Sequence, residues 1–326
     1  MRAVHLTEPS GPSGVRVVEV DEPARDGTDV LIDVHVAGVT FPDLLLSRGA
    51  YQRTLPMPFT LGGEVAGVVR AMPEGARVWP GARVAAILPN FGGFAEWAAV
   101  PAEFVFPLPD GVDFGTAAGV PVNYLTMQFA FRRRTVLLHG ETVLVHGAAG
   151  GVGVAAVQLA RAWGAQVIAV ASTPDKQDVA RAAGAHHVVA VEGFGEAVRQ
   201  IEPGGADVVV DPVGGDRLVE SVRALADEGR LLVVGFASGS IPTLKVNRLM
   251  LHNQSLIGVN LGVSPDGVSV RMESDLHHRW QEIIPLIGNG TVRPFIGMEL
   301  PLERAAEALA ALEGRKGADK ILLRVR

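Results

Sequence analysis

The run Gly-Ala-Ala-Gly-Gly-Val-Gly at residues 147–153 has the composition of a phosphate-binding turn. It lies between a predicted strand, Thr142–His146, and a predicted helix, Gly153–Trp163. Glycines let the backbone approach a pyrophosphate closely, and the amides and dipole of the helix N-terminus attract the anion. Because a further strand follows at Gln166–Ala171, the pattern favours a dinucleotide site over a merely tight turn. The expected contacts are Gly150, Gly151 and Val152.

The end of that second strand indicates which dinucleotide binds. An NAD site places an acidic residue there to accept hydrogen bonds from the ribose 2′-hydroxyl. This chain has Ser172 and Thr173 instead, followed by Lys176. Two hydroxyls and an ammonium suit a 2′-phosphate, for which a charged hydrogen bond contributes ~1.5–3 kcal/mol. We therefore expect NADPH rather than NADH, although Lys176 could equally lie on the solvated first turn of the next helix.

The length, net charge and cysteine content limit which class of protein this can be. The chain has 326 residues, of which 48% are apolar, enough for two domains of roughly 100–200 residues. The net charge of −6 gives no basic field for nucleic acid, and we interpret the single basic run, Arg132–Arg134, as a solvated helix end. With no cysteine, the chain cannot form disulfides or cysteine-ligated zinc sites. No signal peptide and no membrane-spanning run is evident, so we expect a cytoplasmic enzyme.

The pattern of elements changes near Asn123. The first ~120 residues hold short β-branched runs between Gly and Pro clusters, which indicates a barrel-like β domain. Strands and helices then alternate over ~140 residues, which is typical of a doubly wound α/β fold. The strands expected there are Thr142–His146, Gln166–Ala171, His187–Val191, Asp207–Asp211, Arg230–Gly235 and Ser255–Val259. The helices expected between them are Gly153–Trp163, Pro174–Ala183, Gly195–Ile201 and Arg217–Ala226, and a last helix, Leu302–Leu312, precedes a strand at Lys320–Val325.

Several motifs resemble one family. They are the glycine turn with His146 before it, Gly38-Val39-Thr40-Phe41-Pro42-Asp43, Tyr51-Gln52 and Gly92-Gly93-Phe94-Ala95-Glu96-Trp97. Together they resemble the zinc-independent, zeta-crystallin-like quinone oxidoreductases of the medium-chain dehydrogenase/reductase superfamily. The resemblance implies a GroES-like β-barrel catalytic domain at 1–122, an inserted Rossmann domain at 123–262 and a return to the catalytic domain at 263–326. It also implies a homodimer that pairs through the edge strand at 255–259.

The zinc ligands of related dehydrogenases are missing from this chain. Zinc-using relatives carry a cysteine after Gly-Val and a histidine in Gly-His-Glu, where this chain has Thr40 and Gly63. We therefore expect no metal. Without zinc, quinones and enones are the natural hydride acceptors, because the developing charge delocalises onto oxygen.

The residues expected to act on the acceptor are Tyr51, Thr40 and Asp43. Tyr51 is the first choice as a hydrogen-bond donor, since the resemblance places it at the substrate mouth; the alternative is a half-buried packing tyrosine. Thr40 and Asp43 lie in the loop that contacts the nicotinamide in the family, which usually has asparagine where this chain has Thr40. Asp43 could equally cap the helix that follows.

The resemblance implies further cofactor contacts. They are Phe41, Thr126, Val213, Gly235, Phe236, Ala237, Val259, Asn260, Leu261 and Arg315. Those after the fourth, fifth and sixth strands of the sheet lie where a doubly wound fold binds its ligand. Some family members have a tyrosine near the adenosine phosphate where this chain has Val191.

The sequence therefore predicts an NADPH-dependent reductase that transfers a hydride to a quinone. A 2-alkenal or enoyl reductase would use the same chemistry on a different acceptor. A non-catalytic, NADPH-binding structural or RNA-binding crystallin-like protein is the alternative of another class. The only partners expected are the small-molecule substrate and a second copy of the chain, with neither nucleic acid nor membrane.

Overall fold

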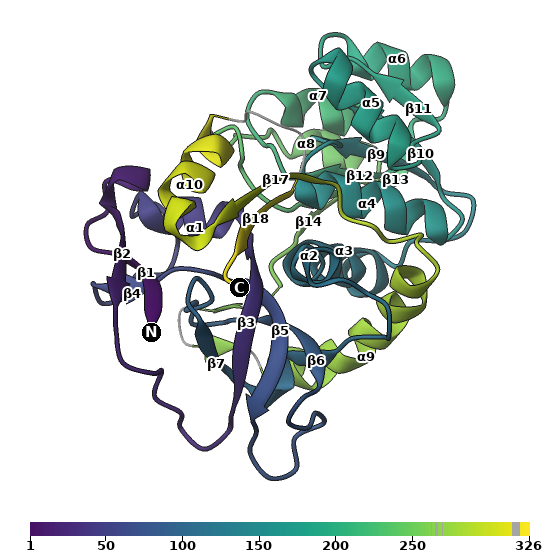
Figure 1. Ribbon diagram of the computed structural model, residues 1–326. Helices are drawn as coiled ribbons and strands as arrows, with labels where there is room; N and C mark the ends of the chain where they lie inside the picture. Colours follow the sequence, from purple (N-terminus) through teal and green to yellow (C-terminus); the bar gives the residue numbers. More distant parts are fainter. Residues whose placement is uncertain (262, 265–266, 269, 315–319) are drawn as a thin grey trace. The chain divides into compact units, whose positions relative to one another are not determined.

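The computed structural model describes residues 1–261, 263–264, 267–268, 270–314 and 320–326. Contacts divide the chain into two units, one of Met1–Leu125 with Gly262–Arg326 and one of Thr126–Leu261. The division falls inside helix α3 (Pro121–Phe129). We call the first the GroES-like unit and the second the Rossmann unit, and describe each by itself (Figure 1).

The Rossmann unit is built on a six-stranded parallel sheet of order β11-β10-β9-β12-β13-β14. In chain order this is 3-2-1-4-5-6, so the connections reverse direction between β9 and β12. The strands are β9 (Thr142–His146), β10 (Gln166–Val170), β11 (His187–Val189), β12 (Ala206–Asp211), β13 (Leu225–Val233) and β14 (Ser255–Gly258). The central strands are continuous runs of buried aliphatic residues, as expected of a sheet covered on both faces.

Helices α4 (Gly151–Ala162), α5 (Pro174–Ala182), α6 (Phe194–Ile201) and α7 (Arg217–Ala224) connect the strands, and short α8 (Asn247–Leu251) precedes β14. All six strands expected here are confirmed as elements. Most boundaries differ from the prediction by one or two residues, and the largest difference is at β13: the helix expected to reach Ala226 ends at Ala224, and β13 begins at once rather than at Arg230. Leu225 has extended dihedral angles and pairs with Ala206, and a register shift then precedes the regular pairing. Burial of Leu225 in the sheet overrides its helix propensity.

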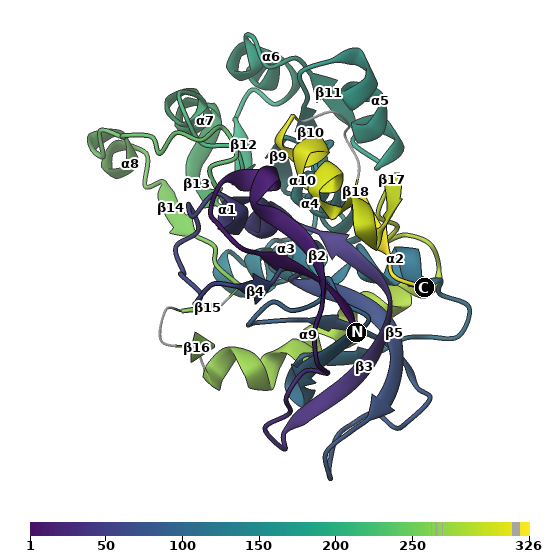
Figure 2. The same cartoon turned by 60° about the vertical axis from the view of Figure 1, so that its left-hand side comes forward.

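The GroES-like unit contains two main sheets. A small one has the order β2-β1-β4, and a larger one has the order β17-β18-β3-β5-β6-β8, with β7 also paired to β3. The strands are β1 (Arg2–Leu6), β2 (Val15–Glu19), β3 (Asp29–Val39), β4 (Phe59–Thr60), β5 (Glu64–Ala71), β6 (Arg83–Ile87), β7 (Trp97–Pro101), β8 (Val105–Pro107), β17 (Ile296–Pro301) and β18 (Lys320–Arg324). The C-terminal strand β18 runs antiparallel to β3, so the end of the chain joins the sheet of the first unit (Figure 2).

Helices α2 (Phe114–Ala118) and α9 (Val270–Gly288) of this unit were not among the predicted elements. The helix expected after Asp43 is α1 (Phe41–Ser47), which begins before Asp43 and holds it at the third position of a capping box whose N-cap is Thr40. Strands β15 (Val263–Ser264) and β16 (Gly267–Val268) form a two-residue ladder. Helix α9 is fixed by Trp280, which stacks on Phe106 with 5.0 Å between ring centroids and donates from Nε1 to Pro107 O at 3.0 Å. The last helix, α10 (Ala305–Glu313), starts three residues later than expected, because Leu302–Arg304 form a 3₁₀ turn.

One buried ion pair joins four segments of the GroES-like unit. The Lys320 ammonium lies 2.5 Å from Glu64 Oε1 and donates to Val39 O at 2.8 Å. The other carboxylate oxygen of Glu64 accepts the amide of Val122, on the first turn of α3, at 2.7 Å. Gly38 makes room for this carboxylate, since a Cβ there would lie 2.5 Å from Glu64 Oε1. Strands β3, β5 and β18 and the start of α3 thus meet at a single carboxylate.

Candidate functional site

The glycine turn joins β9 to α4 and has no side chain at the positions nearest the helix N-terminus. Gly147 has φ of +56°, and Gly150 is the N-cap of α4, where it offers no side-chain acceptor to the first-turn amides. A Cβ on Gly153 would lie 2.1 Å from Gly147 O, so only glycine fits there. Uncapped amides at the N-terminus of a twelve-residue helix suit a pyrophosphate, and these residues therefore fit the dinucleotide that the sequence predicts.

The loop after β12 lies beside the glycine turn, at the point where the strand order reverses. A Cβ on Gly147 would touch the Val213 side chain at 3.1 Å. The loop is shaped by buried Asp211, whose Oδ1 accepts the amides of Val213 and Gly214 at 2.8 and 2.9 Å. The loop after β13 is tied to it, since Ala237 N donates to Pro212 O at 3.0 Å. Three loops that the sequence named separately are thus adjacent in the Rossmann unit.

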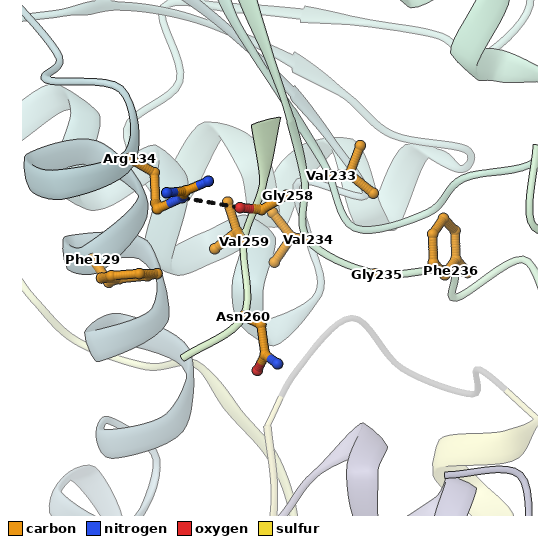
Figure 3. A pocket seen from close by; sticks show the side chains of 9 residues that line it. All are labelled: Phe129, Arg134, Val233, Val234, Gly235, Phe236, Gly258, Val259 and Asn260. Carbon is orange, nitrogen blue, oxygen red and sulfur yellow. Dashed lines mark hydrogen bonds between the residues drawn. The ribbon is translucent and has the colours of Figure 1, made fainter. Parts of the chain in front are cut away.

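A hollow of about 480 Å³ opens at the carboxyl ends of β13 and β14 (Figure 3). Nine residues line it: Phe129, Arg134, Val233, Val234, Gly235, Phe236, Gly258, Val259 and Asn260. Gly235, Phe236, Val259 and Asn260 were predicted as cofactor contacts, and the other five were not. Thr126, Val213, Ala237 and Leu261 are not among the lining residues, and Arg315 lies outside the described residues.

Two of the missed residues come from the end of α3 and the π-helical turn η3 (Ala130–Arg134) that follows it. Arg134 Nε donates to Gly258 O at 3.1 Å, as Figure 3 shows. The interpretation of Arg132–Arg134 as only a solvated helix end is therefore incomplete, since Arg134 lines the hollow and Arg132 lies over the Trp163 ring at 4.1 Å. The sequence did hold a signal for Phe129. It follows the predicted cofactor contact Thr126 by three residues, which places both side chains on the same face of a helix.

The residues expected to hold a 2′-phosphate lie together after β10. Ser172 and Thr173 are exposed, and Thr173 is the N-cap of α5, accepting the Lys176 amide at 3.4 Å. Lys176 is half-buried on the first turn of α5 and forms no ion pair with any described residue. The Thr173 hydroxyl still has its proton to donate while it caps the helix.

His146, the last residue of β9, is buried directly before the glycine turn. Its Nε2 lies 2.8 Å from Ser221 Oγ, and its ring meets Phe194 edge-on at 4.8 Å. Ser221 donates its own proton to Arg217 O at 2.9 Å, so His146 Nε2 must be the donor in the shared hydrogen bond. Burial, more than any nearby charge, lowers the pKa of His146 to about 4 and keeps the ring neutral. The sequence analysis gave this residue no role.

The predicted acceptor residues are brought together in the GroES-like unit. Thr40 is the N-cap of α1, and its amide and hydroxyl donate to Asp43 Oδ2 at 2.8 and 2.5 Å. Asp43 is fully buried, and its Oδ1 accepts the amide of Gly62 at 3.0 Å. A Cβ on Gly63 would lie 3.8 Å from Thr40 Oγ1 and 3.4 Å from the Phe91 ring. The position that holds histidine in zinc-using relatives is thus bordered by a hydroxyl and an aromatic ring.

Phe91 is a neighbour of the predicted acceptor residues that the sequence analysis did not name. Tyr51 meets it edge-on, with 6.0 Å between centroids and an angle of 90°. Phe91 has φ of +59°, a strained value for a large side chain. The loop before it is held by Arg53, which donates to Pro89 O and Asn90 Oδ1 at 2.7 and 2.6 Å.

Burial raises the pKa of Asp43 to about 6, against the lowering effect of its hydrogen bonds from Thr40 and Gly62 and of the Lys320 charge. Burial also raises the pKa of Tyr51, and the charge of Asp43 adds to that effect. Asp43 therefore lies within electrostatic reach of the Tyr51 phenol. Phe41, predicted as a cofactor contact, is half-buried at the start of α1. The catalytic roles of Tyr51, Thr40 and Asp43 stay predictions.

A doubly wound sheet with a glycine turn at its reversal point, inserted into a GroES-like unit, defines a medium-chain dehydrogenase/reductase. Residues 26–110 match the alcohol dehydrogenase GroES-like domain, and residues 151–287 match a family described as zinc-binding dehydrogenase. The chain is 36% identical over 303 residues to quinone oxidoreductase-like protein 2 of Bos taurus, covering 90% of this chain and 84% of that protein. It is 33% identical over 315 residues to the quinone oxidoreductase of Homo sapiens, covering 94% and 92%. The chain belongs to the quinone oxidoreductase family of that superfamily.

Solved structures agree with this assignment. The quinone oxidoreductase of Thermus thermophilus, solved alone and with NADPH, is 35% identical with a TM-score of 0.85, and each chain is covered over 100% of its length. A probable oxidoreductase of Mycobacterium abscessus is 40% identical with a TM-score of 0.88, covering 100% of this chain and 99% of that one. These matches confirm the family and the fold class that the sequence predicted.

Among the residues that the structure describes, no group of three or more His, Cys, Asp or Glu residues could hold a metal ion. No helix in the same part of the chain is long and apolar enough to cross a membrane.

Burial of neutral His146 predicts a loss of stability in acid. Because the folded state lowers the His146 pKa from 6.5 to about 4, the unfolded chain takes up the proton first, and stability falls as pH drops from about 6.5 towards 4. Urea denaturation at pH 7 and pH 5 should therefore show a smaller acid loss for His146→Gln than for the wild type. His187→Gln, an exposed histidine of the same unit, is the control and should behave as the wild type does. Equal acid losses in all three proteins would contradict the assignment.

Proposed function

We propose that this protein is an NADPH-dependent oxidoreductase that transfers a hydride to a quinone without a metal. The observation that carries the proposal is the uncapped glycine turn at the N-terminus of α4, beside the loop after β12. The quinone oxidoreductase relatives, one of them solved with NADPH, support the same cofactor and reaction. The hollow beyond β13 and β14, about 480 Å³, is within the ordinary size range for a small-molecule site.

When bound, the nicotinamide supplies the hydride. The first-turn amides of α4 bind the pyrophosphate, and the lack of side chains at Gly150 and Gly153 allows the close approach. Ser172, Thr173 and Lys176 bind the 2′-phosphate. Phe236 and Asn260 orient the cofactor within the hollow. None of these contacts requires a rearrangement of the sheet, since each residue lies at a strand end or a helix start.

The GroES-like unit provides the groups that act on the acceptor. Tyr51 and Phe91 meet edge to face, and this aromatic pair suits a planar ring. The hydroxyls of Thr40 and Tyr51 can stabilise charge that develops on the acceptor oxygen. A quinone, being planar and carrying two such oxygens, uses both features, and an open-chain alkenal uses only the hydroxyls.

The first test is turnover. The purified protein should oxidise NADPH faster than NADH, and faster with 1,4-benzoquinone or 9,10-phenanthrenequinone than with 2-hexenal. Consumption of NADPH is followed by absorbance, and formation of the hydroquinone by chromatography. Faster reduction of the alkenal would change the acceptor to an enone. Tight NADPH binding without turnover of either acceptor would favour the non-catalytic alternative.

Lys176→Ala tests the cofactor preference. Loss of the ammonium should raise the KM for NADPH by about tenfold to a hundredfold, the equivalent of a charged hydrogen bond, and leave the KM for NADH nearly unchanged. Arg181→Ala, on the last turn of the same helix, is the matched control and should change neither constant. If Lys176→Ala raised both KM values equally, the 2′-phosphate assignment would be wrong.

The second copy of the chain is proposed to pair at β14. This strand ends the order of the Rossmann sheet, and among the described residues it pairs with β13 alone. Apolar side chains are exposed on it and just before it: Leu256 is 42% exposed, and Met250 and Leu251 of α8 are 72% and 68% exposed. Pairing with the same strand of a second copy would satisfy the open edge and cover these residues. The cytoplasmic location and the absence of a nucleic-acid partner stay predictions.

The dimer is tested by solution mass. Leu256→Lys with Met250→Glu should convert a dimer to a monomer in size-exclusion chromatography with light scattering, because buried charges would oppose pairing. Val219→Lys alters an exposed apolar residue on α7 of the same unit and should leave the mass unchanged. A wild type that is monomeric at micromolar concentration, or a double variant that remains dimeric, would contradict pairing at β14.

A further inference from the structure

Arg134 brings a positive charge to the wall of the hollow in the Rossmann unit. All the lining residues lie between Phe129 and Asn260, so this unit alone carries the site (Figure 3). The aliphatic and aromatic ones are Phe129, Val233, Val234, Phe236 and Val259. Asn260 is polar but uncharged, and there is no aspartate or glutamate among the lining residues. The hollow therefore combines an apolar wall with one cationic side chain.

A π-helical turn directs Arg134 toward the hollow. In a regular α-helix, a residue five positions after Phe129 would point about 140° away from it. Here the chain is π-helical over Ala130–Arg134, and the amide of Thr135 donates to Ala130 O, five residues back, at 3.1 Å. Figure 3 shows Arg134 and Phe129 projecting from the same helix toward the end of β14. Single π-helical turns of this kind are frequent at functional sites.

The chain leaves this turn through a strained residue. Val136 has φ of +53°, a conformation that branched side chains avoid, and it is exposed. The strain is held by Leu137, which is buried and donates its amide to Phe131 O at 2.7 Å. Backbone strain of this type gathers at binding sites. Two irregularities of the backbone thus flank Arg134, the π-helical turn before it and Val136 after it.

One hydrogen bond fixes the guanidinium and leaves its other donors available. Arg134 Nε donates to Gly258 O at 3.1 Å, and within the described part of the chain Arg134 makes no other hydrogen bond and no ion pair. The side chain is exposed, so the N–H groups of both terminal nitrogens can reach a ligand. Their planar fork matches the oxygens of a carboxylate or a sulfonate, and such charge-assisted pairs are stronger than neutral hydrogen bonds.

The phosphates of the cofactor do not need this charge. They are assigned to the first turn of α4 and to the residues after β10. Helix α4 follows β9, and β12 and β13 lie between β9 and β14 in the order of the sheet. Because adjacent strands are ~4.8 Å apart, the glycine turn and Gly258 are separated by about 14 Å across the sheet. A nicotinamide ring is neutral when reduced and positive when oxidised, so it offers Arg134 no anion either.

We propose that the hollow of the Rossmann unit binds acceptors that carry an anionic group on a planar aromatic body, and that Arg134 selects them by pairing with that group. A quinone with a carboxylate or sulfonate substituent is the class that fits. The inference rests on the proposed function, because it names the acceptors of that same reaction. The apolar lining residues contact the aromatic body, and Arg134 determines specificity without taking part in hydride transfer.

Unreactive ligands test the site without turnover. Calorimetry compares naphthalene-2-carboxylate with naphthalene-2-carboxamide, which has the same shape and no charge. The wild type should bind the carboxylate about tenfold more tightly, the equivalent of one charged hydrogen bond, and high salt should reduce this preference. Arg134→Gln should abolish the preference. Arg134→Lys should keep part of it, since the charge remains and the planar fork is lost.

Arg132 provides a matched control on the same turn. Its guanidinium lies over the Trp163 ring at 4.1 Å, and it does not line the hollow. Arg132→Gln removes the same charge as Arg134→Gln and should keep the wild-type preference for the carboxylate. If both variants lost the preference equally, the net charge of the surface would explain it, and the assignment to Arg134 would be wrong.

Turnover then connects the site with the reaction. The acceptors compared are 9,10-anthraquinone-2-carboxylate and the corresponding carboxamide. Arg134→Gln should raise the KM for the carboxylate by about tenfold and leave the KM for the carboxamide unchanged. The kcat for both acceptors and the Kd for NADPH should stay as in the wild type, because a general structural defect would change them as well.

The outcomes distinguish this inference from the proposed function. A wild type that reduces uncharged quinones but prefers the carboxylate neither in binding nor in KM would refute the inference alone. A wild type that reduces no quinone would refute the proposed function and the acceptor class with it. If Arg134→Gln lowered the mass of a dimer in light scattering and left the ligand preference unchanged, the guanidinium would bind the second copy, and the inference would be refuted.

Discussion

The GroES-like unit depends on the burial of Glu64 with Lys320. Taking two charges out of water is unfavourable, and removing one partner of such a pair costs about 3–5 kcal/mol. Two further hydrogen bonds offset part of this cost, since Lys320 donates to the Val39 carbonyl and Glu64 accepts the Val122 amide in the first turn of α3. Lys320 comes from the last strand and Glu64 from the fifth, so the pair forms only when the C-terminal strand has joined the sheet of the GroES-like unit. Thr40 directly follows Val39, and Gly63 directly precedes Glu64. The Glu64–Lys320 pair therefore also fixes the backbone positions of Thr40 and Gly63.

The Rossmann unit accommodates its buried polar side chains without an ion pair of this kind among its described residues. Its buried histidine is neutral and its buried Asp211 is satisfied by the amides of the loop that it shapes. The first-turn amides of α4 are not capped by a side chain, and they are available to an anionic ligand. The GroES-like unit therefore pairs its buried charges with each other, whereas the Rossmann unit leaves backbone donors available for a phosphate. These donors are available because the glycine turn lies at the point where the strand order of the sheet reverses.

The fold was largely predictable because its strongest signals are local. Most strands of the Rossmann sheet contain an apolar run bounded by glycine or polar residues, and all six were found, although β13 also includes the polar stretch Asp227–Arg230 before its apolar end. The failures come from contacts that are not local in the sequence. Leu225 has a helical neighbourhood and was extended into a strand by pairing with Ala206, a contact that no window of sequence contains. Helix α9 was missed, although the Trp280 stack on Phe106 holds it in place, because that stack joins residues 174 positions apart.

The sequence by itself determined the glycine turn, the strand ends that surround it and the absence of cysteine ligands, because each depends on residue types at short spacing. Only the tertiary structure decided that Arg134 lines the hollow, that Phe91 flanks Gly63 and that Asp43 is buried against Thr40. Thr40 and Asp43 are close in the sequence, yet the raised pKa of Asp43 comes from burial, to which distant segments contribute. Local pattern specifies which groups are present, and long-range packing sets their dielectric surroundings and therefore their chemistry.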